Sequence, residues 1–458
     1  MRTRILLSLI TGLVLQGCSR TTADYRSQPA DPEMLHAAMR QLSGVIVYDI
    51  FSPPQASRVY AYSSIAAYEA LRPDYAAKYR TLAGQLNGLT PVPPPLPGVR
   101  YYLPLSSVHA FMTVGKAMTF SSAKMDSLRK VMEDKIRDKG IPSPVFDSSI
   151  AYGDRVAQHV LAWSKKDNYL QTRGMPKYTV LPTPGRWVPT PPAYMDGVEP
   201  SWGKIRPFVL DSATQFKPEP PPPFDTARNS AFMRQVMEVY NVRKTLTQEQ
   251  QDIAGFWDCN PYTMHVRGHA MFATKKITPG GHWMGIAALA SRMSHADMMR
   301  SAEVYARTAV ALADGFIAVW EQKYRNNLAR PETVINMYVD DQWEPALQTP
   351  PFPEYMSAHS VVSSAAAKVL TDEFGPTFAF NDNVEDDYGI RPRRFASFDQ
   401  AAAEAVISRL YGGIHYRLAI EEGALQGAKI GDLVVRRVQM VTGRAPARTA
   451  SLPRPPLN

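Results

Sequence analysis

The chain has 458 residues, of which 45% are hydrophobic, and its formal net charge is +9. This length and hydrophobic content are enough for a large buried core, formed by two packed units or by one large helical domain. The positive charge is spread along the chain and no clustered run of Lys and Arg stands out, which argues against a nucleic-acid partner.

Residues 1–17 have the pattern of a lipoprotein signal peptide. Arg2 and Arg4 precede the apolar run ILLSLITGLVL, which is too short to span a bilayer, and the following LQGC ends on Cys18. We expect cleavage before Cys18 and lipidation of its thiol, which would anchor an exported bacterial protein to a membrane of the cell envelope. A membrane-spanning segment is the weaker alternative. Only Cys259 would remain unmodified, so the mature chain could form no internal disulfide.

The region 18–166 has mostly helical patterns. Asp31 is a suitable N-cap, and Pro32 occupies the first position of a predicted helix. Further helical patterns, some of them after the break PVPPPLPG, cover residues up to 87 and residues 105–120, 122–138 and 148–166.

A proline-rich segment covers residues 167–228. The stretches LPTPGRWVPTPPAYMDG and KPEPPPPFD exclude a regular helix or a central strand. We interpret the segment as a long ordered excursion that carries Trp187 and Trp202. A flexible linker is the alternative.

Helical periodicity returns in the region 229–440, which we expect to form the catalytic helical bundle. The patterns cover residues 229–256, 283–328, 358–374 and 397–440. Because few segments alternate with a period of two, the predicted fold class is all-α. The Pro- and Arg-rich tail at 441–458 is expected to be disordered.

The first of three notable segments is WEQKYRNNLARP. Lys323 and Arg330 are seven positions apart, which is two turns and one face of a helix that Pro331 would end. Taken alone, such a pair usually belongs to a solvated helix face.

The second segment is PPFPEYMSAHS. Its prolines favour an extended approach, after which Ser357, the amide of Ala358 and His359 would lie at the N-terminus of a helix. Free backbone N–H groups and the helix dipole favour an anion there. The alternative is an ordinary serine N-cap beside an incidental histidine.

The third segment is SRLYGGIHYRLAIEEG. Arg409 lies in the last turn of one predicted helix, Gly412 and Gly413 break the chain, and His415 begins the next helix. The glycines permit a tight turn, so that Arg409 and His415 can face a common point.

In this order, the three segments resemble the signature shared by the phosphatidic acid phosphatase type 2 and vanadium-dependent haloperoxidase superfamily. The resemblance covers about residues 250–435. Within the superfamily, the chain most resembles bacterial haloperoxidase-like lipoproteins. It implies helical bundles of that type, connected by long Pro-rich loops.

The resemblance also implies residue roles. The predicted cradle for a vanadate or phosphate oxyanion consists of Lys323, Arg330, Ser357, Ala358 and Arg409. His415 would be the axial ligand of vanadium, His359 the acid and base, and Lys323 the group that polarises bound hydrogen peroxide, which oxidises a halide or an organic acceptor. In the phosphatase alternative, His415 would be the nucleophile and His359 the general acid.

Aromatic residues favour the haloperoxidase. Trp320 and Phe352 match positions that line the halide pocket of chloroperoxidase-type members, although a core position is the alternative for each. Asp258, in FWDCNP, resembles the acidic partner of the site arginine.

The position of an acidic partner for His415 also separates the two activities. Phosphatases of the superfamily usually carry Asp four residues after the nucleophilic histidine, where this chain has Ala419. Neither Glu421 nor Glu422 is placed like that missing Asp.

Ala358 replaces the usual glycine of the family, and this keeps open a degenerate site in a surface lipoprotein that only binds partners. His265 and His269 have a spacing found in some zinc sites but lack the adjacent Glu, which argues against zinc. His282 matches a structural position near the site. A homo-oligomer is compatible with the sequence.

Overall fold

The computed structural model describes residues 30–181 and 183–443. The signal-peptide prediction and Cys18 lie outside these residues. The α-helices are α1 (Pro32–Tyr48), α2 (Pro53–Leu71), α3 (Leu103–Ala117), α4 (Ser122–Asp138), α5 (Ser143–Ser164), α6 (Tyr169–Arg173), α7 (Ala231–Lys244), α8 (Gln248–Phe256), α9 (Pro279–Met293), α10 (Met298–Asn326), α11 (Pro331–Tyr338), α12 (Ala358–Phe374), α13 (Phe398–Tyr411) and α14 (Arg417–Arg437). Three short 3-10 helices are Arg72–Tyr75, Trp202–Lys204 and Asp386–Tyr388.

Strands are few, and the predicted all-α class is confirmed. Two antiparallel pairs occur in the described residues: β1 (Met264–Arg267) with β2 (Ala270–Ala273), and β3 (Phe380–Asp382) with β4 (Arg393–Phe395). The β1–β2 hairpin places His265 on a strand, where its ring stacks on Phe272 and its Nε2 lies 2.8 Å from the Thr274 hydroxyl. His265 and His269 therefore do not share a helix face.

Local sequence signals explain where several helices begin. The Asp31 side chain accepts a hydrogen bond from the amide of Glu33, and Pro32 is the first residue of α1, as predicted. Ser52 caps α2 in the same way, again before a proline. At these positions the cap satisfies an amide that has no partner within the helix.

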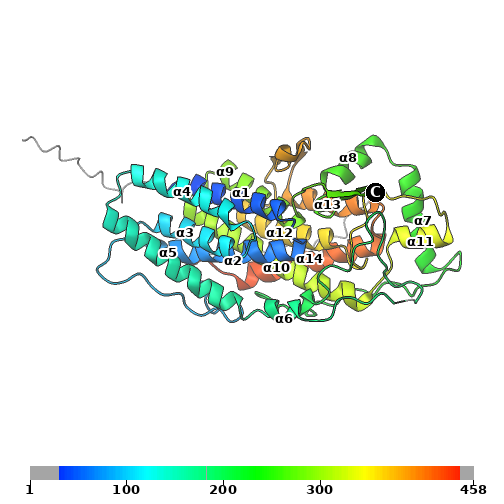
Figure 1. The fold of residues 1–458 in the computed structure, drawn as a ribbon, viewed down its shortest axis with the longest axis horizontal. Helices are drawn as coiled ribbons and strands as arrows, with labels where there is room; N and C mark the ends of the chain where they lie inside the picture. Colours follow the sequence, from blue (N-terminus) through cyan, green and yellow to red (C-terminus); the bar gives the residue numbers. More distant parts are fainter. Residues whose placement is uncertain (1–29, 182, 444–458) are drawn as a thin grey trace, which may run out of the picture.

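The long helix α10 lies at the centre of the molecule and is buried along most of its length. It packs against α2, which belongs to the N-terminal part of the chain, and against α9, α12 and α14, which belong to the C-terminal part (Figure 1). One apolar cluster consequently extends from Leu35 to Met440. None of the described helices is both long enough and apolar enough to cross a membrane.

Helices α12 and α14 approach each other closely because three glycines of α14 face α12. A Cβ on Gly427 would lie 2.1 Å from the carbonyl oxygen of Val361, and one on Gly431 would lie 2.6 Å from the carbonyl oxygen of Ala365. On Gly423 it would lie 2.9 Å from the carbonyl oxygen of Ser357. Backbone therefore packs directly on backbone, which holds the start of α12 next to the start of α14.

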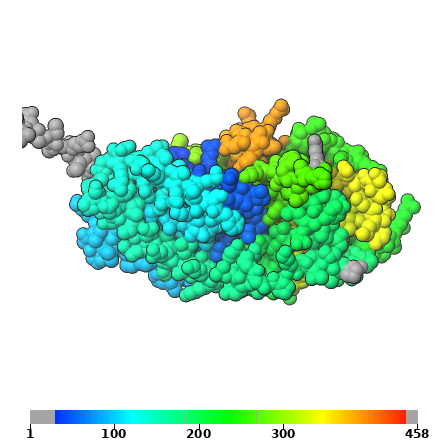
Figure 2. Space-filling model, in the orientation of Figure 1, coloured from blue at the N-terminus to red at the C-terminus, as the bar shows by residue number. Residues whose placement is uncertain are grey.

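The described residues of the Pro-rich segment, 167–181 and 183–228, run over one side of the body (Figure 2). Trp187 and Trp202 are both buried. The buried carboxylate of Asp314 on α10 accepts backbone hydrogen bonds of 2.6–2.9 Å from residues 208–210. These bonds tie the excursion to the central helix.

Two boundary predictions were wrong. Residue 441 pairs with Tyr79, so the chain is ordered beyond 440, while residues 444–458 lie outside the described part. Lys323 and Arg330 do not share a helix, because α10 ends at Asn326 and Arg330 is the N-cap of α11. Proline at the first helical position favours starting a helix, so Pro331 begins α11.

Candidate active site

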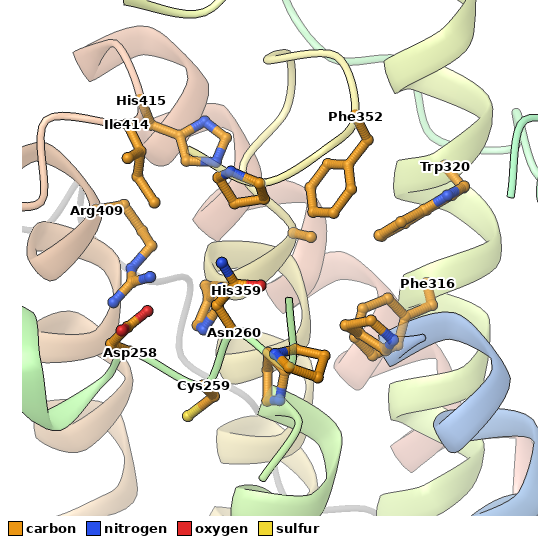
Figure 3. A pocket seen from close by; sticks show the side chains of 15 residues that line it. Asp258, Cys259, Asn260, Phe316, Trp320, Phe352, His359, Arg409, Ile414 and His415 are labelled. Carbon is orange, nitrogen blue, oxygen red and sulfur yellow. The ribbon is translucent and has the colours of Figure 1, made fainter. Parts of the chain in front are cut away.

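The three predicted segments converge on one cavity at the C-terminal end of α10. Its polar lining includes Asn260, His359, Arg409 and His415. Ala358 also lines it. The opposite wall is aromatic and carries Phe316, Trp320 and Phe352 (Figure 3).

Arg409 and His415 reach the cavity across the predicted glycine break. Helix α13 ends at Tyr411, and Gly413 adopts a positive φ of 75°, a conformation that favours glycine. His415 lies in the short connection before α14, which begins at Arg417 and not at His415. The turn nevertheless brings the Arg409 and His415 side chains to the same cavity.

His415 is buried and contacted at both ring nitrogens. Its Nδ1 lies 2.7 Å from Oε1 of Glu354, and its Nε2 lies 3.1 Å from Nη1 of Arg330. Burial, followed by the nearby cations Arg330 and Lys323, holds the pKa of His415 well below its usual range. The ring is therefore neutral at pH 7.

Arg330 is buried between the loop before α12 and the connection before α14. Its Nε donates to the carbonyl oxygen of Phe352 at 2.9 Å, and its Nη1 donates to that of Ile414 at 2.8 Å. Its buried Nη2 finds no hydrogen-bond partner among the residues that the structure describes. Burial lowers the pKa of Arg330 to about 10, so the guanidinium stays charged at neutral pH.

Lys323 is buried behind the aromatic wall and does not itself line the cavity. Its Nζ donates to the carbonyl oxygens of Pro353, Glu354 and Met356 at 2.5–3.0 Å. Burial and the neighbouring Arg330 hold the pKa of Lys323 well below its usual range. In this arrangement Lys323 clamps the loop that leads into α12, and its predicted contact with substrate stays a prediction.

Arg409 completes the set of buried cations. It donates from Nη2 to the carbonyl oxygen of Trp257 at 2.6 Å and from Nε to Ser408 at 3.0 Å. Burial lowers its pKa, and the nearby Asp258 opposes that shift. Asp258 faces Arg409 in Figure 3, while its carboxylate forms an ion pair with Lys276.

The start of α12 provides the second histidine. Ser357 is the N-cap, and its Oγ accepts hydrogen bonds from the amide and the hydroxyl of Ser360. The N-cap alternative is thus realised, yet the hydroxyl hydrogen of Ser357 is still available for donation. Ser357 is not among the residues that line the cavity, whereas Ala358 and His359 are.

His359 has one ring nitrogen that is left unpaired by the described residues. This nitrogen, Nε2, is buried and accepts or donates no hydrogen bond within that part of the chain. Burial, together with the charge of Arg409, holds the pKa of His359 well below its usual range, so the ring is neutral at pH 7. A neutral histidine with an unpartnered nitrogen can exchange a proton with a guest in the cavity.

The charges around the cavity fit a bound anion. Within the described residues, Lys323, Arg330 and Arg409 form no ion pair with any carboxylate, although all three are buried. A buried charge needs a compensating partner. The unpartnered Nη2 of Arg330 and Nε2 of His359 indicate that a small oxyanion is a suitable guest.

Trp320 and Phe352 form the predicted aromatic wall. Their ring centroids are 4.9 Å apart, and the indole N–H of Trp320 donates to the carbonyl oxygen of Val198 at 3.1 Å. The Phe352 ring also lies 5.1 Å from both the Lys323 ammonium and the Arg330 guanidinium. Lys323 and Arg330 thus lie next to this wall, although neither is among the residues that line the cavity.

Two site residues were not predicted. Glu354 supplies the carboxylate on His415, and it comes from the loop PFPEYM, which has no periodicity that would indicate its position. Asn260 lies within the stretch FWDCNP that also contains Asp258, and its buried Nδ2 has no partner in residues 30–181 and 183–443.

His282 lies in a separate buried cluster behind Cys259. Its Nε2 is 2.9 Å from Asp382 and its Nδ1 is 3.0 Å from Glu385, to which the Cys259 thiol also donates. Burial alone would lower the pKa of His282, but Asp382 and Cys259 raise it well above its usual value. Cys259, His282 and Glu385 bring their side-chain donor atoms within 4.8 Å of one another, and these groups also contact each other directly.

The comparisons with known proteins agree with this geometry. A model described as the second helical-bundle domain of vanadium chloroperoxidase matches residues 303–444. The crystal structure of the first bacterial vanadium-dependent iodoperoxidase is 50% identical, with a TM-score of 0.86 over 91% of this chain and 99% of that chain. A comparison with curated proteins gave no match.

Two further structures share the fold at lower identity. They are the apo-type and holo-type forms of a bacterial vanadium-dependent chloroperoxidase, each 16% identical. Their TM-scores are 0.62 and 0.61, over 83% and 85% of this chain and 92% and 93% of theirs.

Proposed function

Because the chain belongs to the vanadium-dependent haloperoxidase family, we propose that it oxidises iodide with hydrogen peroxide at a vanadate held by His415. The choice of iodide rests on the relative that is 50% identical, which is an iodoperoxidase. The observation that carries the proposal is the set of three buried cations, none of which forms an ion pair in the described part of the chain, beside His415 and His359.

The residues present suit vanadate. The Nε2 of neutral His415 offers a lone pair, and Arg330 and Arg409 offer charged donors from two sides. Lys323 adds positive charge and holds the loop on which Glu354 and Phe352 lie. Bound vanadate would supply a Lewis acid that activates hydrogen peroxide for attack by halide, without a change in its own oxidation state.

His359 would move the protons of the reaction. Its unpartnered Nε2 can accept a proton from hydrogen peroxide and return it to the leaving oxygen. Burial, and after it the charge of Arg409, holds the pKa of His359 low, so the ring is neutral before the reaction. Trp320 and Phe352 would exclude water and leave a polarisable apolar wall for the halide.

One observation favours the phosphatase as a second candidate. The Nδ1 of His415 is held by a carboxylate, Glu354, as the nucleophilic histidine of a phosphatase would be. In that activity His415 would take the phosphoryl group, and His359 would protonate the leaving oxygen.

Assays on the purified protein separate the two activities. Vanadate-dependent oxidation of iodide by hydrogen peroxide, abolished in His415→Ala and retained in the exposed-histidine control His265→Ala, supports the haloperoxidase. Hydrolysis of phosphate esters that vanadate inhibits, without any halide oxidation, would contradict it. Failure to bind either anion would instead favour the degenerate binding lipoprotein, as the Ala358 substitution allows.

We also propose that the protein is an exported lipoprotein anchored through Cys18. The lipoprotein pattern of residues 1–18 supports this placement, which would bring the enzyme to hydrogen peroxide outside the cytoplasm. Labelling with a radioactive fatty acid tests it: the wild-type protein should incorporate label and fractionate with membranes. Labelling that persists in Cys18→Ser would contradict the anchor.

A further inference from the structure

The two ring nitrogens of His415 have different partners, and together these determine which nitrogen carries the hydrogen. Arg330 has only N–H donors, so the Nε2 that it contacts at 3.1 Å must be the acceptor. The remaining hydrogen of the neutral ring is then on Nδ1, which donates to Oε1 of Glu354 at 2.7 Å. The lone pair of Nε2 consequently points at Arg330, and it would become available to a guest if the guest's oxygens took over the hydrogen bond from Arg330.

Glu354 is itself held rigidly. The same Oε1 accepts a hydrogen bond of 3.0 Å from the amide of Tyr416, the residue after His415. The Glu354 amide donates to the carbonyl oxygen of Leu328 at 3.0 Å, and its own carbonyl accepts from Lys323 at 3.0 Å. The side chain is fully buried, and a turn of the carboxylate or of the imidazole would break the two hydrogen bonds that each of them makes.

From these contacts we propose that Glu354 is the positioning residue that fixes the tautomer and the ring orientation of His415 for binding the oxyanion's central atom. This inference rests on the proposed function and deepens it. A carboxylate on the far nitrogen of a ligating histidine orients the ring and makes it a better ligand. Here the carboxylate comes from the loop before α12, whereas position 419 on α14 is alanine.

A positioning role and a simple charge role predict opposite results. If Glu354 only neutralised Arg330 and Lys323, its removal would leave a more positive site, and every anion would bind more tightly. If it positions His415, its removal weakens only anions that bond to Nε2. Vanadate would form that bond, whereas inorganic phosphate at equilibrium depends on the cations.

The test measures the vanadate and phosphate affinities of Glu354→Leu and Glu354→Gln. Leucine removes charge and acceptor together, while glutamine removes the charge and keeps an acceptor oxygen. We expect vanadate affinity to fall about 10- to 100-fold in Glu354→Leu and to be largely retained in Glu354→Gln. Phosphate affinity should stay constant or rise in both. The proposal would be overturned if both variants changed vanadate affinity equally. It would also be overturned if phosphate affinity fell in parallel with vanadate affinity.

The matched control is Glu422→Gln. Glu422 is a buried carboxylate on α14 that accepts from the amide of Glu219 at 3.0 Å. This variant should bind vanadate like the wild-type protein. In a His415→Ala background, Glu354→Leu should have no further effect on vanadate affinity, because its partner is gone. A further loss there would show that Glu354 acts by another route.

A second measurement needs no variant at Glu354 and no vanadate. Nitrogen-15 NMR of the histidine-labelled protein, assigned with His415→Ala, reports the tautomer of His415 directly. The proposal requires hydrogen on Nδ1, and hydrogen on Nε2 would overturn it. If the wild-type protein binds no vanadate, the proposed function fails, while this measurement still decides the role of Glu354.

Discussion

Replacing Gly427 with alanine tests the contact that brings His359 and His415 together. His359 is the second residue of α12, and His415 precedes α14 by two residues. At Gly427 a Cβ would lie 2.1 Å from the carbonyl oxygen of Val361 and 2.9 Å from its Cα. Both atoms belong to the backbone of α12, so no side chain can rotate away.

The size of the effect follows from this distance. Cβ atoms are essentially never found closer than 3.0 Å to such atoms, so α12 and α14 must separate locally by roughly 0.9 Å from the 2.1 Å approach. Overpacking of this kind costs about 3 kcal/mol, and the better helix propensity of alanine returns about 1 kcal/mol. We expect the free energy of unfolding to fall by about 2 kcal/mol.

Urea unfolding of the purified variant measures this change. The matched control is Gly44→Ala in α1, where a Cβ meets nothing within 4 Å. That variant should gain about 0.5–1 kcal/mol through propensity alone. Vanadate affinity should fall only in Gly427→Ala, because the separation of α12 from α14 moves His359 relative to His415. If Gly427→Ala were as stable as Gly44→Ala, the close backbone contact would be refuted.

Two further predictions concern histidines. Burial lowers the pKa of His36 from 6.5 to about 4, so protons bind the unfolded chain preferentially and the stability from His36 is lost as the pH falls towards 4. Between pH 7 and pH 4, the free energy of unfolding should fall by about 3 kcal/mol more in the wild-type protein than in His36→Gln. If the free energies of unfolding of the two proteins changed in parallel with pH, this prediction would be wrong. For His359→Gln, we expect vanadate affinity within a few fold of wild type and iodide turnover reduced about 10²-fold or more in steady-state assays. Unchanged turnover would exclude His359 as the proton carrier.

Local signals in the sequence predicted much of the helical fold. The bounds of α12 at 358–374 follow from the Ser357 cap and the apolar periodicity after it, and α1 begins where Asp31 and Pro32 indicate. The position of Arg330 was missed, because Asn327 ends α10 in a left-handed conformation before Pro331 starts the next helix. Spacing along one helix could not reveal that interruption.

The predicted site residues lie together, but some of their contacts could not be inferred from sequence. Glu354 and His415 are 61 residues apart, and their pairing depends on how the loop before α12 folds against the start of α14. Likewise, no local sequence signal indicated that the Lys323 ammonium donates its three hydrogen bonds to loop carbonyl oxygens. Both features are tertiary, because they require two chain segments to meet.

A crystal structure of the protein soaked with vanadate tests the central claim most directly. We expect vanadium bonded to Nε2 of His415, with Arg330 and Arg409 donating hydrogen bonds to the vanadate oxygens and with Nε2 of His359 facing the bound anion. An anion bound anywhere else, or vanadate bonded to no histidine, would contradict it.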